Sequence, residues 1–539
     1  YTQPNLFIAL GDTNVYSVFL EQDPNQGMQP YRVKAPNLFA TADGIYEFTS
    51  WIGSDVSFEE QNNRETAIVF LESGATATAN YTLVSDQEHE AVVYEGEELI
   101  IPAGANFVCA NAFSLQVEGE LIIAGTKDEP VSLVTHFETY SPDITAFIEV
   151  KDGGKLYGSG LQITGDPGCC LSPPLIKAQP GSIVKISHST FTTNGTGIMA
   201  EDAYVELSRC VISPIGTLTD FTNGIDITLN DHTHNSFSPT NNLFNQVLLE
   251  NCSILGMDKG IDIQININSS GYWKGLYIHN SIMTENNTGI KGEGYLSSNV
   301  ELDYVNISNL TNYDINGNIT NSHIQTTNPL LDNNHYPTNN SPVIDWGDPS
   351  SPFDPDGTQI DLGAYYKHQP PSIPTNFKIK GLAGNSPRLT FNSNEDYVHT
   401  WHILRKLGNE QEFSVLAVVY ETQYIDNTVT IAADKKFSQD ACYKVIAVDN
   451  FGFESNPTNS RCKAVVGNQD KLLNVPMEYA LHHAFPNPFN PETTIKYDLP
   501  EQSKVHLNIF DLLGRKINTL KNNTEDAGFY SIKWNGRDE

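Results

Sequence analysis

The chain is short of the residues that mark disulfide-stapled, zinc-binding and membrane-spanning proteins. Only 7 of its 539 residues are cysteine and only 5 are methionine. Seven cysteines in so long a chain do not form the framework of a small disulfide-rich fold. No CxxC or Cys/His ligand spacing occurs, so zinc binding is not expected. No apolar run approaches the roughly 18 residues that a membrane helix needs, so no membrane span is expected either.

Positive charge is also scarce. The chain has 31 Lys and Arg against 65 Asp and Glu, a net charge of −34. Such a surface repels nucleic acid phosphates and anionic membranes, which excludes both as partners. The same charge keeps an extracellular protein soluble and attracts divalent cations. It disfavours the unassisted binding of polyanionic glycans such as pectate.

The residues that are abundant predict an all-β protein of several domains. Hydrophobic residues make up 39% of the chain and aromatics 10%, enough to build folded cores. Asn, Thr, Ser, Gly and Ile are favoured, a choice typical of turns and short strands. A chain of this length exceeds one ordinary core. It begins at Tyr1 without Met or a signal peptide and stops at Glu539, so we expect a processed or excised piece.

Pro-rich and polar stretches divide the chain into four segments. We predict domains at residues 1–86, 87–368, 369–467 and 468–539.

An internal repeat defines the second segment. Five six-residue strands carry Val, Ile or Leu at positions one and three, the period of a half-buried strand. They begin at Val184, Val205, Val247, Leu276 and Val300. Their spacing of about 21 to 42 residues suits one coil of a structure in which successive turns lay parallel strands on one another.

Three further positions of the repeat carry expectations. A Gly-Ile pair follows most copies, beginning at Gly197, Gly224, Gly260 and Gly289. The fifth position lies near the strand end, where Asn251 and Asn280 could join a hydrogen-bonded Asn ladder. The sixth position is small or apolar, so we expect Cys210 and Cys252 to be stacked core residues without a disulfide.

Both ends of this segment resemble known proteins. The alternating, glycine-punctuated run from Leu99 to Thr126 resembles the opening coils of the pectate-lyase-like superfamily. The run from Ser341 to Tyr365 resembles the closing motif of right-handed parallel β-helix repeat proteins. The resemblance covers about 280 residues and implies a right-handed parallel β-helix.

The flanking segments resemble accessory β domains. The first segment is similar to the short modules that precede β-helices in surface proteins, and we expect its Trp51 to lie in the core. The third segment resembles a fibronectin type III module, which implies a β-sandwich with Phe391 in place of the usual early Trp. The similar runs are Trp401–Arg405, Tyr424–Asp426, Tyr443–Asp449 and Glu454–Ser455. Cys442 and Cys462 fall in consecutive predicted strands and could be bridged, and in such a module this bridge would join the last two strands.

The last segment carries the most specific pattern. Phe485–Tyr497 (FPNPFNPETTIKY), Val505–Arg515 (VHLNIFDLLGR), Gly528 and Trp534 resemble the type A C-terminal sorting domain of the type IX secretion system. The resemblance implies a bacterial protein exported to the cell surface or the extracellular space, with the type IX machinery as a partner. The strands usual after Trp534 are missing, so we expect a truncated sorting β-sandwich.

Four residues directly after the isoleucines of the Gly-Ile pairs form a column of candidate site residues. They are Met199, Asp226, Asp262 and Lys291. Polysaccharide lyases of the resembled shape use carboxylates to hold calcium and a Lys or Arg as base. Asp226, Asp262 and Lys291 supply those chemical types on neighbouring coils. The alternative interpretation, which the sequence favours, is a solvated outer face that happens to be charged.

Two other groups could hold a metal. Asp354, Asp356 and Asp361 offer oxygen ligands for calcium, although a turn that satisfies its own backbone amides is the favoured interpretation. His232 and His234 project to one side of an extended strand but sit in a polar insertion without a third ligand. No nucleophile elbow, phosphate loop or HExxH motif is present.

Two functions remain open at this stage. The favoured one is a non-catalytic surface protein acting in adhesion, glycan binding or surface structure, with extracellular polysaccharide or other surface proteins as partners. The other is a calcium-dependent polysaccharide lyase or glycoside hydrolase using Asp226, Asp262 and Lys291. Self-assembly through exposed end coils is a further possibility.

Overall fold

Every regular element in the described part of the computed structural model is a β-strand, so the all-β prediction is confirmed. The chain forms two compact units, residues 1–369 and 370–539. The structure describes residues 5–10, 13–19, 31–54, 56–70, 76–86, 89–109, 113–135, 146–165, 173–215, 222–230, 246–266, 275–308, 311–393, 398–408, 410–433, 438–467, 476, 478–486, 492–511, 515–526 and 528–537. Side chains are not described at 5–10, 13–19, 31–32, 70, 76, 229–230, 265–266, 293–299 and 311–319.

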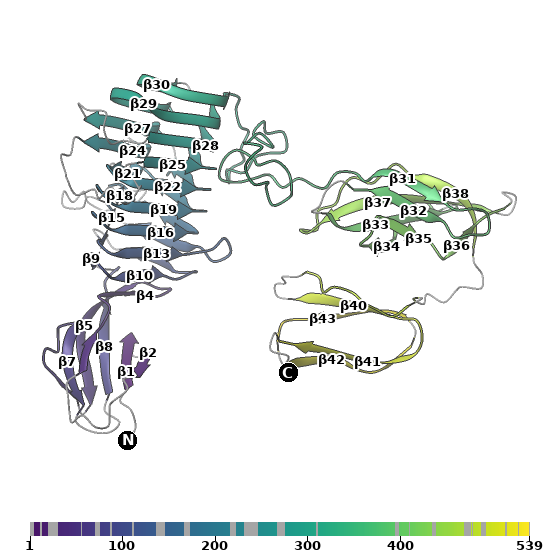
Figure 1. Ribbon diagram of the computed structural model, residues 1–539, viewed down its shortest axis with the longest axis horizontal. Helices are drawn as coiled ribbons and strands as arrows, with labels where there is room; N and C mark the ends of the chain where they lie inside the picture. Colours follow the sequence, from purple (N-terminus) through teal and green to yellow (C-terminus); the bar gives the residue numbers. More distant parts are fainter. Residues whose placement is uncertain are drawn as a thin grey trace. The chain divides into compact units, whose positions relative to one another are not determined.

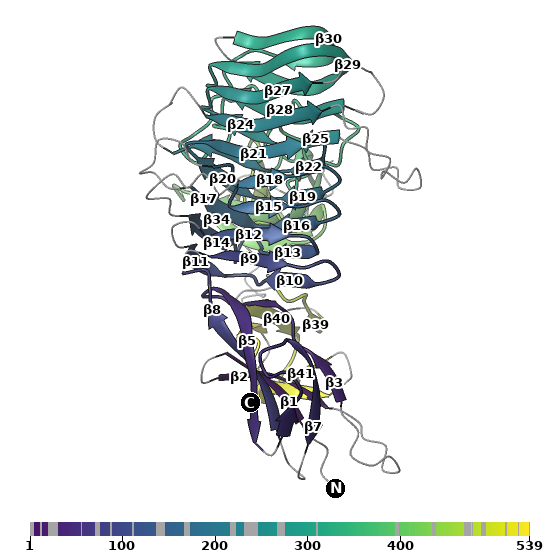
Figure 2. The same cartoon turned by 90° about the vertical axis from the view of Figure 1, so that its left-hand side faces the viewer.

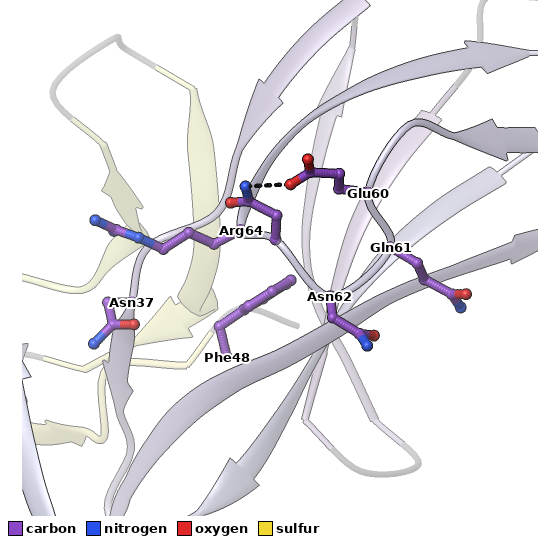
Figure 3. A pocket seen from close by; sticks show the side chains of 7 residues that line it. Asn37, Phe48, Glu60, Gln61, Asn62 and Arg64 are labelled. Carbon is purple, nitrogen blue, oxygen red and sulfur yellow. Dashed lines mark hydrogen bonds between the residues drawn. The ribbon is translucent and has the colours of Figure 1, made fainter.

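The first eight strands form a small domain of two sheets. One sheet contains β1 (Asn5–Leu10), β2 (Thr13–Phe19), β4 (Leu38–Ala40), β5 (Ile45–Ser54) and β8 (Thr76–Leu83). The other contains β3 (Tyr31–Lys34), β6 (Val56–Phe58) and β7 (Glu65–Phe70). Trp51 is fully buried and packs against Phe48 and Phe58, as expected for a core residue. The turn between β6 and β7 borders a depression in this domain (Figure 3).

Residues 90–325 form what we call the parallel stack, in which each strand pairs in parallel with the strand of the next layer (Figures 1 and 2). From β9 (Glu90–Val93) to β25 (Gln246–Glu250), the partner is the strand three places further along the chain, and β26 (Ser253–Leu255) pairs with the end of β28 (Gly275–Thr284). Three strands therefore make one layer, and the layers build three faces. Apolar side chains point inward from all three faces into one continuous core.

The first face consists of β9, β12 (Ser114–Val117), β15 (Ile148–Val150), β18 (Ile176–Ala178), β21 (Thr196–Glu201), β24 (Asn223–Asn230), β27 (Lys259–Asn266) and the starts of β29 (Thr288–Ser308) and β30 (Thr311–Gln325). The second face consists of β10 (Glu98–Ile101), β13 (Glu120–Ala124), β16 (Lys155–Ser159), β19 (Ile183–Ser187), β22 (Tyr204–Ser208), β25 (Gln246–Glu250), β28 (Gly275–Thr284) and the later parts of β29 and β30. The third face consists of β11 (Asn106–Cys109), β14 (Val131–Thr135), β17 (Leu161–Thr164), β20 (Thr190–Thr193), β23 (Val211–Pro214), β26 and the ends of β28 and β29.

The internal repeat predicted the register of the second face. Val184 pairs with Val205, Val205 with Val247, Val247 with Leu276, and Leu276 with Val300. All five are buried, because positions one and three of each strand point inward. The predicted alignment is therefore confirmed residue by residue.

The fifth position of the repeat turns the chain from the second face to the third. Its residues adopt left-handed backbone conformations, with φ between 48° and 53°, at His188, Arg209, Asn251, Asn280, Tyr304 and His323. A left-handed residue reverses the pleat and bends the strand sharply. Asn tolerates this conformation better than most residues, which explains two of the six choices.

The Gly-Ile marker reflects close packing between layers of the first face. A Cβ atom on Gly224 would lie 2.5 Å from the carbonyl oxygen of Gly260 and 2.7 Å from Cγ2 of Ile254. Gly197 and Gly260 meet the carbonyl oxygen of the next layer in the same way. Only glycine fits this column, whereas the isoleucine that follows each glycine fills the core.

The small N-terminal domain packs against the first layer of the stack. Leu38, Ala40 and Ile45 belong to the same apolar core as the stack strands. The backbone N–H of Asn106 donates to the carbonyl oxygen of Ala42 at 2.8 Å. These contacts cover the apolar end of the first layer, which would otherwise be exposed to water.

Residues 326–369, the closing segment, lie along the side of the stack. Val343, Leu362 and Ala364 pack with Val211 and Ile282, which point outward from the third face. The backbone N–H of Ala364 donates to Oγ of Ser253 at 2.9 Å. The segment thereby buries apolar side chains on the outside of the third face.

The second unit begins with a two-sheet sandwich. One sheet contains β31 (Thr375–Lys380), β32 (Arg388–Asn392) and β35 (Gln423–Ile425), and the other β33 (Val398–Leu407), β34 (Ser414–Val419), β36 (Val429–Ile431), β37 (Gln439–Asp449) and β38 (Arg461–Gly467). Phe391 and Trp401 pack in its core. Cys442 and Cys462 are opposite each other in β37 and β38 and are joined by a disulfide.

The last part of the chain folds into two small sheets. One contains β39 (Ala480–Leu481), β40 (Thr493–Leu499) and β43 (Gly528–Trp534), and the other β41 (Ser503–Phe510) and β42 (Lys516–Glu525). Ile495, Tyr497 and Leu499 alternate inward along β40 and are buried. The Tyr497 ring stacks on that of Tyr530, its register partner in β43.

Candidate functional site

The predicted column of site residues runs across consecutive layers of the first face. Met199 pairs with Asp226, Asp226 with Asp262, and Asp262 with Lys291. The column continues back through Lys177 to Glu149 and forward to Asp314. The structure thus brings Asp226, Asp262 and Lys291 together on adjacent strands.

The interpretation of this column as a solvated outer face is wrong for its two aspartates. Asp226 is only 9% exposed and Asp262 only 3%, and Lys291 is half-buried. The period-2 pattern correctly places these residues on the side of the strand opposite the inward isoleucines. It does not show whether other parts of the chain cover that side. The side chain of Lys259, three residues before Asp262, forms an ion pair with the Asp262 carboxylate.

Burial gives Asp226 unusual acid–base properties. Loss of water raises its pKa to about 6, and the neighbouring Asp262 carboxylate adds to the rise, while Lys259 opposes it. Its Oδ1 atom has no hydrogen-bond partner among the described residues. A carboxyl group of this pKa can hold or release a proton near neutral pH, the property required of a general acid or base.

The part of the column nearer the N-terminus is neutralised by ion pairs. Glu149 is buried. Its carboxylate forms an ion pair with Lys151 at 2.8 Å and accepts a hydrogen bond from the Gln179 amide at 2.5 Å. Lys177, the register partner of Glu149, lies 3.2 Å from Glu201. These pairs satisfy buried charges and leave Asp226 as the exception in the column.

The calcium candidates Asp354, Asp356 and Asp361 bind backbone amides of their own segment. Asp354 Oδ2 accepts the N–H of Asp361 at 2.7 Å. The two oxygens of Asp361 accept the N–H groups of Asp345 at 2.7 Å and Lys367 at 2.6 Å. Asp356 accepts the N–H of Thr358 at 3.2 Å and that of Gln369 at 2.6 Å. This geometry agrees with a turn that satisfies its own amides.

The same carboxylates do not fit calcium in this arrangement. Burial raises the pKa of Asp354 to about 6 and that of Asp361 to about 7. Asp354 Oδ1 is buried and forms an ion pair with the Arg209 guanidinium at 3.6 Å. In the described residues, no three His, Cys, Asp or Glu side chains are grouped so that they could hold a metal ion.

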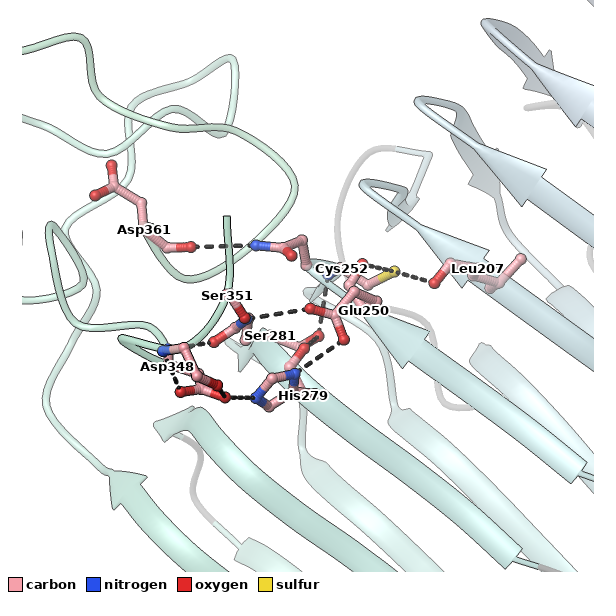
Figure 4. Close-up of polar contacts among 11 residues, drawn as sticks. Leu207, Glu250, Cys252, His279, Ser281, Asp348, Ser351 and Asp361 are labelled. Atoms are coloured by element: carbon pink, nitrogen blue, oxygen red, sulfur yellow. Dashed lines mark hydrogen bonds and ion pairs between the residues drawn. The ribbon is translucent and has the colours of Figure 1, made fainter. Parts of the chain in front are cut away.

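Sequence reasoning missed a charged network between the stack and the closing segment (Figure 4). Nδ1 of His279 lies 3.0 Å from Glu250 Oε2, and Nε2 of His279 lies 3.2 Å from Asp348 Oδ2. The bond to Glu250 is the main cause of a raised His279 pKa. Asn280 donates to Glu250 Oε1 and to Oγ of Ser351, both at 3.1 Å, and its Oδ1 accepts the N–H of Asp348 at 2.7 Å.

The Asn ladder expected from the fifth position takes a different form. The Asn251 amide donates to the carbonyl oxygen of Asp361 at 3.3 Å, and Asn280 binds Asp348 and Ser351. Both side chains thus tie the closing segment to the stack. The sequence signal for this role was asparagine at the fifth position, where a left-handed corner points the side chain outward from the bend.

One sequence prediction lies outside the described residues. It concerns the two histidines of the polar insertion, His232 and His234. Cys210 and Cys252 are described, and both are buried free thiols in the core, as expected. No helix in the described ranges has the length and apolarity to cross a bilayer.

Comparison with known proteins identifies the C-terminal domain. Residues 483–534 match the family model described as the secretion system C-terminal sorting domain. Such a domain marks a protein exported by type IX secretion to the cell surface or the extracellular space, and it implies contact with that machinery. The predicted localisation is therefore confirmed.

Other comparisons add no functional information. No curated protein matches the chain. A solved structure titled "Titin kinase and its flanking domains" is 15% identical, with a TM-score of 0.14, over 24% of this chain and 27% of that chain. The match therefore spans about a quarter of that protein's chain.

Proposed function

We propose that the chain is a secreted bacterial surface or extracellular protein whose parallel stack is a non-catalytic scaffold for adhesion, glycan binding or surface structure. The observation that carries the proposal is the burial of Asp226 and Asp262. Two carboxylates closed off from water are also closed off from a polysaccharide chain. The sorting domain supports the extracellular setting.

In this proposal residues 87–368, which include the stack and nearly all of the closing segment, are a right-handed parallel β-helix domain. Pairing of each strand with the third strand along supports a coil of three strands. Stacked coils give an ordered surface on which equivalent positions recur at the spacing of neighbouring strands, about 4.8 Å. A long carbohydrate or protein partner can bind such a surface at several equivalent positions.

The remaining segments have accessory roles in this proposal. Residues 1–86 cover the first coil, residues 369–467 are a fibronectin type III-like spacer or adhesion unit, and residues 468–539 direct secretion. The two-sheet sandwich with Phe391 and Trp401 in its core supports the second assignment.

The alternative function is a polysaccharide lyase or glycoside hydrolase that uses Asp226, Asp262 and Lys291. Asp226 favours it, because it combines a pKa of about 6 with a buried oxygen that has no partner among the described residues. In that function Asp226 would exchange the proton and Lys291 would stabilise negative charge on the substrate. A calcium requirement remains a prediction of this alternative.

One experiment separates the two functions. The full chain is incubated with a panel of neutral and acidic polysaccharides, with calcium and with a chelator, and the release of unsaturated and reducing sugars is measured. The scaffold proposal expects binding to insoluble polysaccharide or to cell-surface material without release of product. Release that disappears in Asp262→Ala, while the variant melts at the temperature of the parent, would establish the enzyme instead.

A further inference from the structure

The depression in the N-terminal domain is a separate feature from the charged column. It is wide open to solvent, has a volume of about 600 Å³ and is lined by Asn37, Phe48, Glu60, Gln61, Asn62, Asn63 and Arg64. Pockets of roughly 300–1,000 Å³ hold small organic ligands. Figure 3 shows Phe48 between Asn37 and Arg64 on one side and Asn62 on the other.

The turn that forms one wall of this depression is held in place before any ligand arrives. The N–H of Glu60 donates to Oγ1 of Thr66 at 2.9 Å, and the Asn63 amide donates to Glu60 Oε2 at 2.8 Å. The indole N–H of buried Trp51 donates to the carbonyl oxygen of Asn63 at 3.0 Å. A fixed wall reduces the entropy that a ligand must overcome on binding.

The tip of the same turn offers hydrogen-bonding groups that are not used within the chain. The side chains of Gln61 and Asn62 are exposed, and neither bonds to another residue in the described ranges. An amide side chain both donates and accepts. Sugar hydroxyls do the same, so amides can pair with them in either direction.

Phe48 supplies an apolar surface in the same lining. Its ring is packed against Trp51 at 5.7 Å and Tyr81 at 5.9 Å between centroids, and the residue is only partly buried. The ring is therefore held in one orientation with part of its surface facing the depression. A partly exposed aromatic ring is suited to the apolar C–H face of a sugar ring.

The charges around the depression favour a neutral ligand. The guanidinium of Arg64 is bound to Glu97 and lies 5.1 Å from the centre of the Tyr94 ring, and the Lys34 ammonium lies 3.6 Å from the same carboxylate. With the Glu60 carboxylate in the lining, the two cations are matched by two carboxylates. With the net charge of −34 on the whole chain, an anionic ligand would be repelled.

We propose that this depression binds a neutral saccharide of one or two sugar units. The amides of Gln61 and Asn62 pair with its hydroxyl groups, and Phe48 contacts its C–H face. The site lies in the small N-terminal domain and does not depend on the function of the parallel stack.

The test titrates the full chain with the neutral disaccharides cellobiose, maltose, xylobiose and chitobiose, using ligand-observed NMR and calorimetry. Digalacturonate serves as the anionic comparison. We expect at least one neutral disaccharide to bind with a dissociation constant on the order of 1 mM. Binding should weaken at least tenfold in the double variant Gln61→Ala/Asn62→Ala and in Phe48→Leu. Asn333→Ala, which removes an exposed amide of the closing segment, should leave it unchanged.

The outcomes are decisive in both directions. The Gln61 and Asn62 changes lie on an exposed turn, so a melting temperature equal to that of the parent separates loss of binding from loss of folding. The proposal fails if none of the neutral disaccharides binds at 10 mM (roughly tenfold above the expected constant), if digalacturonate binds more tightly, or if binding survives in both variants. Asp226→Asn and Asp262→Ala should not affect this binding, which distinguishes it from any ligand of the stack.

Discussion

Nε2 of His279, in the second face of the stack, lies 3.2 Å from Oδ2 of Asp348 in the closing segment, and the Nδ1 atom of the same ring lies 3.0 Å from Glu250. One imidazolium thus bridges a carboxylate of the stack and a carboxylate of the closing segment. Because both ring nitrogens must carry protons to donate in both directions, the bridge is complete only when His279 is charged.

Replacing this histidine should loosen the closing segment. His279→Ala removes two charge-assisted hydrogen bonds and leaves Glu250 facing Asp348, so we expect a loss of about 1–3 kcal/mol in the stability of that attachment. Hydrogen exchange of residues 341–365 should become faster. His323→Ala, which removes a similar pair with Asp303 without a direct bond to the closing segment, should leave that exchange unchanged.

The attachment should also depend on pH. The His279 pKa is raised above 6.5 by Glu250, so the folded state binds the proton more tightly than the unfolded state. The resulting stabilisation is full below pH 6.5 and is lost as pH rises through the folded pKa. Hydrogen exchange of residues 341–365 should therefore accelerate as pH rises above 6.5. Equal exchange rates below and above the titration of His279, after correction for the intrinsic pH effect, would contradict the assignment.

Asp226 should destabilise the stack at neutral pH. Its pKa of about 6 lies above the model-peptide value of 3.8, so the folded state binds the proton more tightly and stability falls as pH rises from about 4 to 7. Asp226→Asn keeps the shape and removes the buried charge. We expect it to raise the stability of the stack by about 1–3 kcal/mol at pH 7.5 and to have little effect at pH 4. Thermal unfolding of both proteins at the two pH values measures the difference.

A failure of this prediction would be informative about the site. If Asp226→Asn is neutral or destabilising at pH 7.5, the Asp226 carboxylate has a partner beyond the described residues. Asp258→Asn is a suitable control, because Asp258, directly before β27, is a partly exposed carboxylate that accepts the Asn287 amide at 3.1 Å.

Sequence patterns predicted the register of the stack but not the surroundings of its side chains. The alternation at Val184 and Val205 and the recurrence of Gly-Ile are consequences of one strand lying on the next, so both are visible in the sequence. Asp262 is buried together with its ion-pair partner Lys259. The period-2 pattern of the strand does not show that Asp226 is buried, because it gives only the side of the strand on which a residue lies. The bridge from His279 to Asp348 joins residues 69 positions apart, and no local pattern reports such a contact.

The marker glycines provide the sharpest test of the packing between layers. Gly224→Ala would place a Cβ atom 2.5 Å from the carbonyl oxygen of Gly260, a backbone atom that cannot move without shifting the next layer. We expect a loss of about 2–3 kcal/mol in the free energy of unfolding, measured by chemical unfolding of the full chain.

Gly165→Ala is the matched control, because a Cβ there would meet the Leu175 side chain at an ordinary 3.5 Å. At Gly165 the added methyl group should change stability by less than about 1 kcal/mol, since alanine also reduces the entropy of the unfolded chain. Equal effects at the two positions would mean that the layers around Gly224 are further apart than the structure has them, and that the recurrence of glycine has another cause.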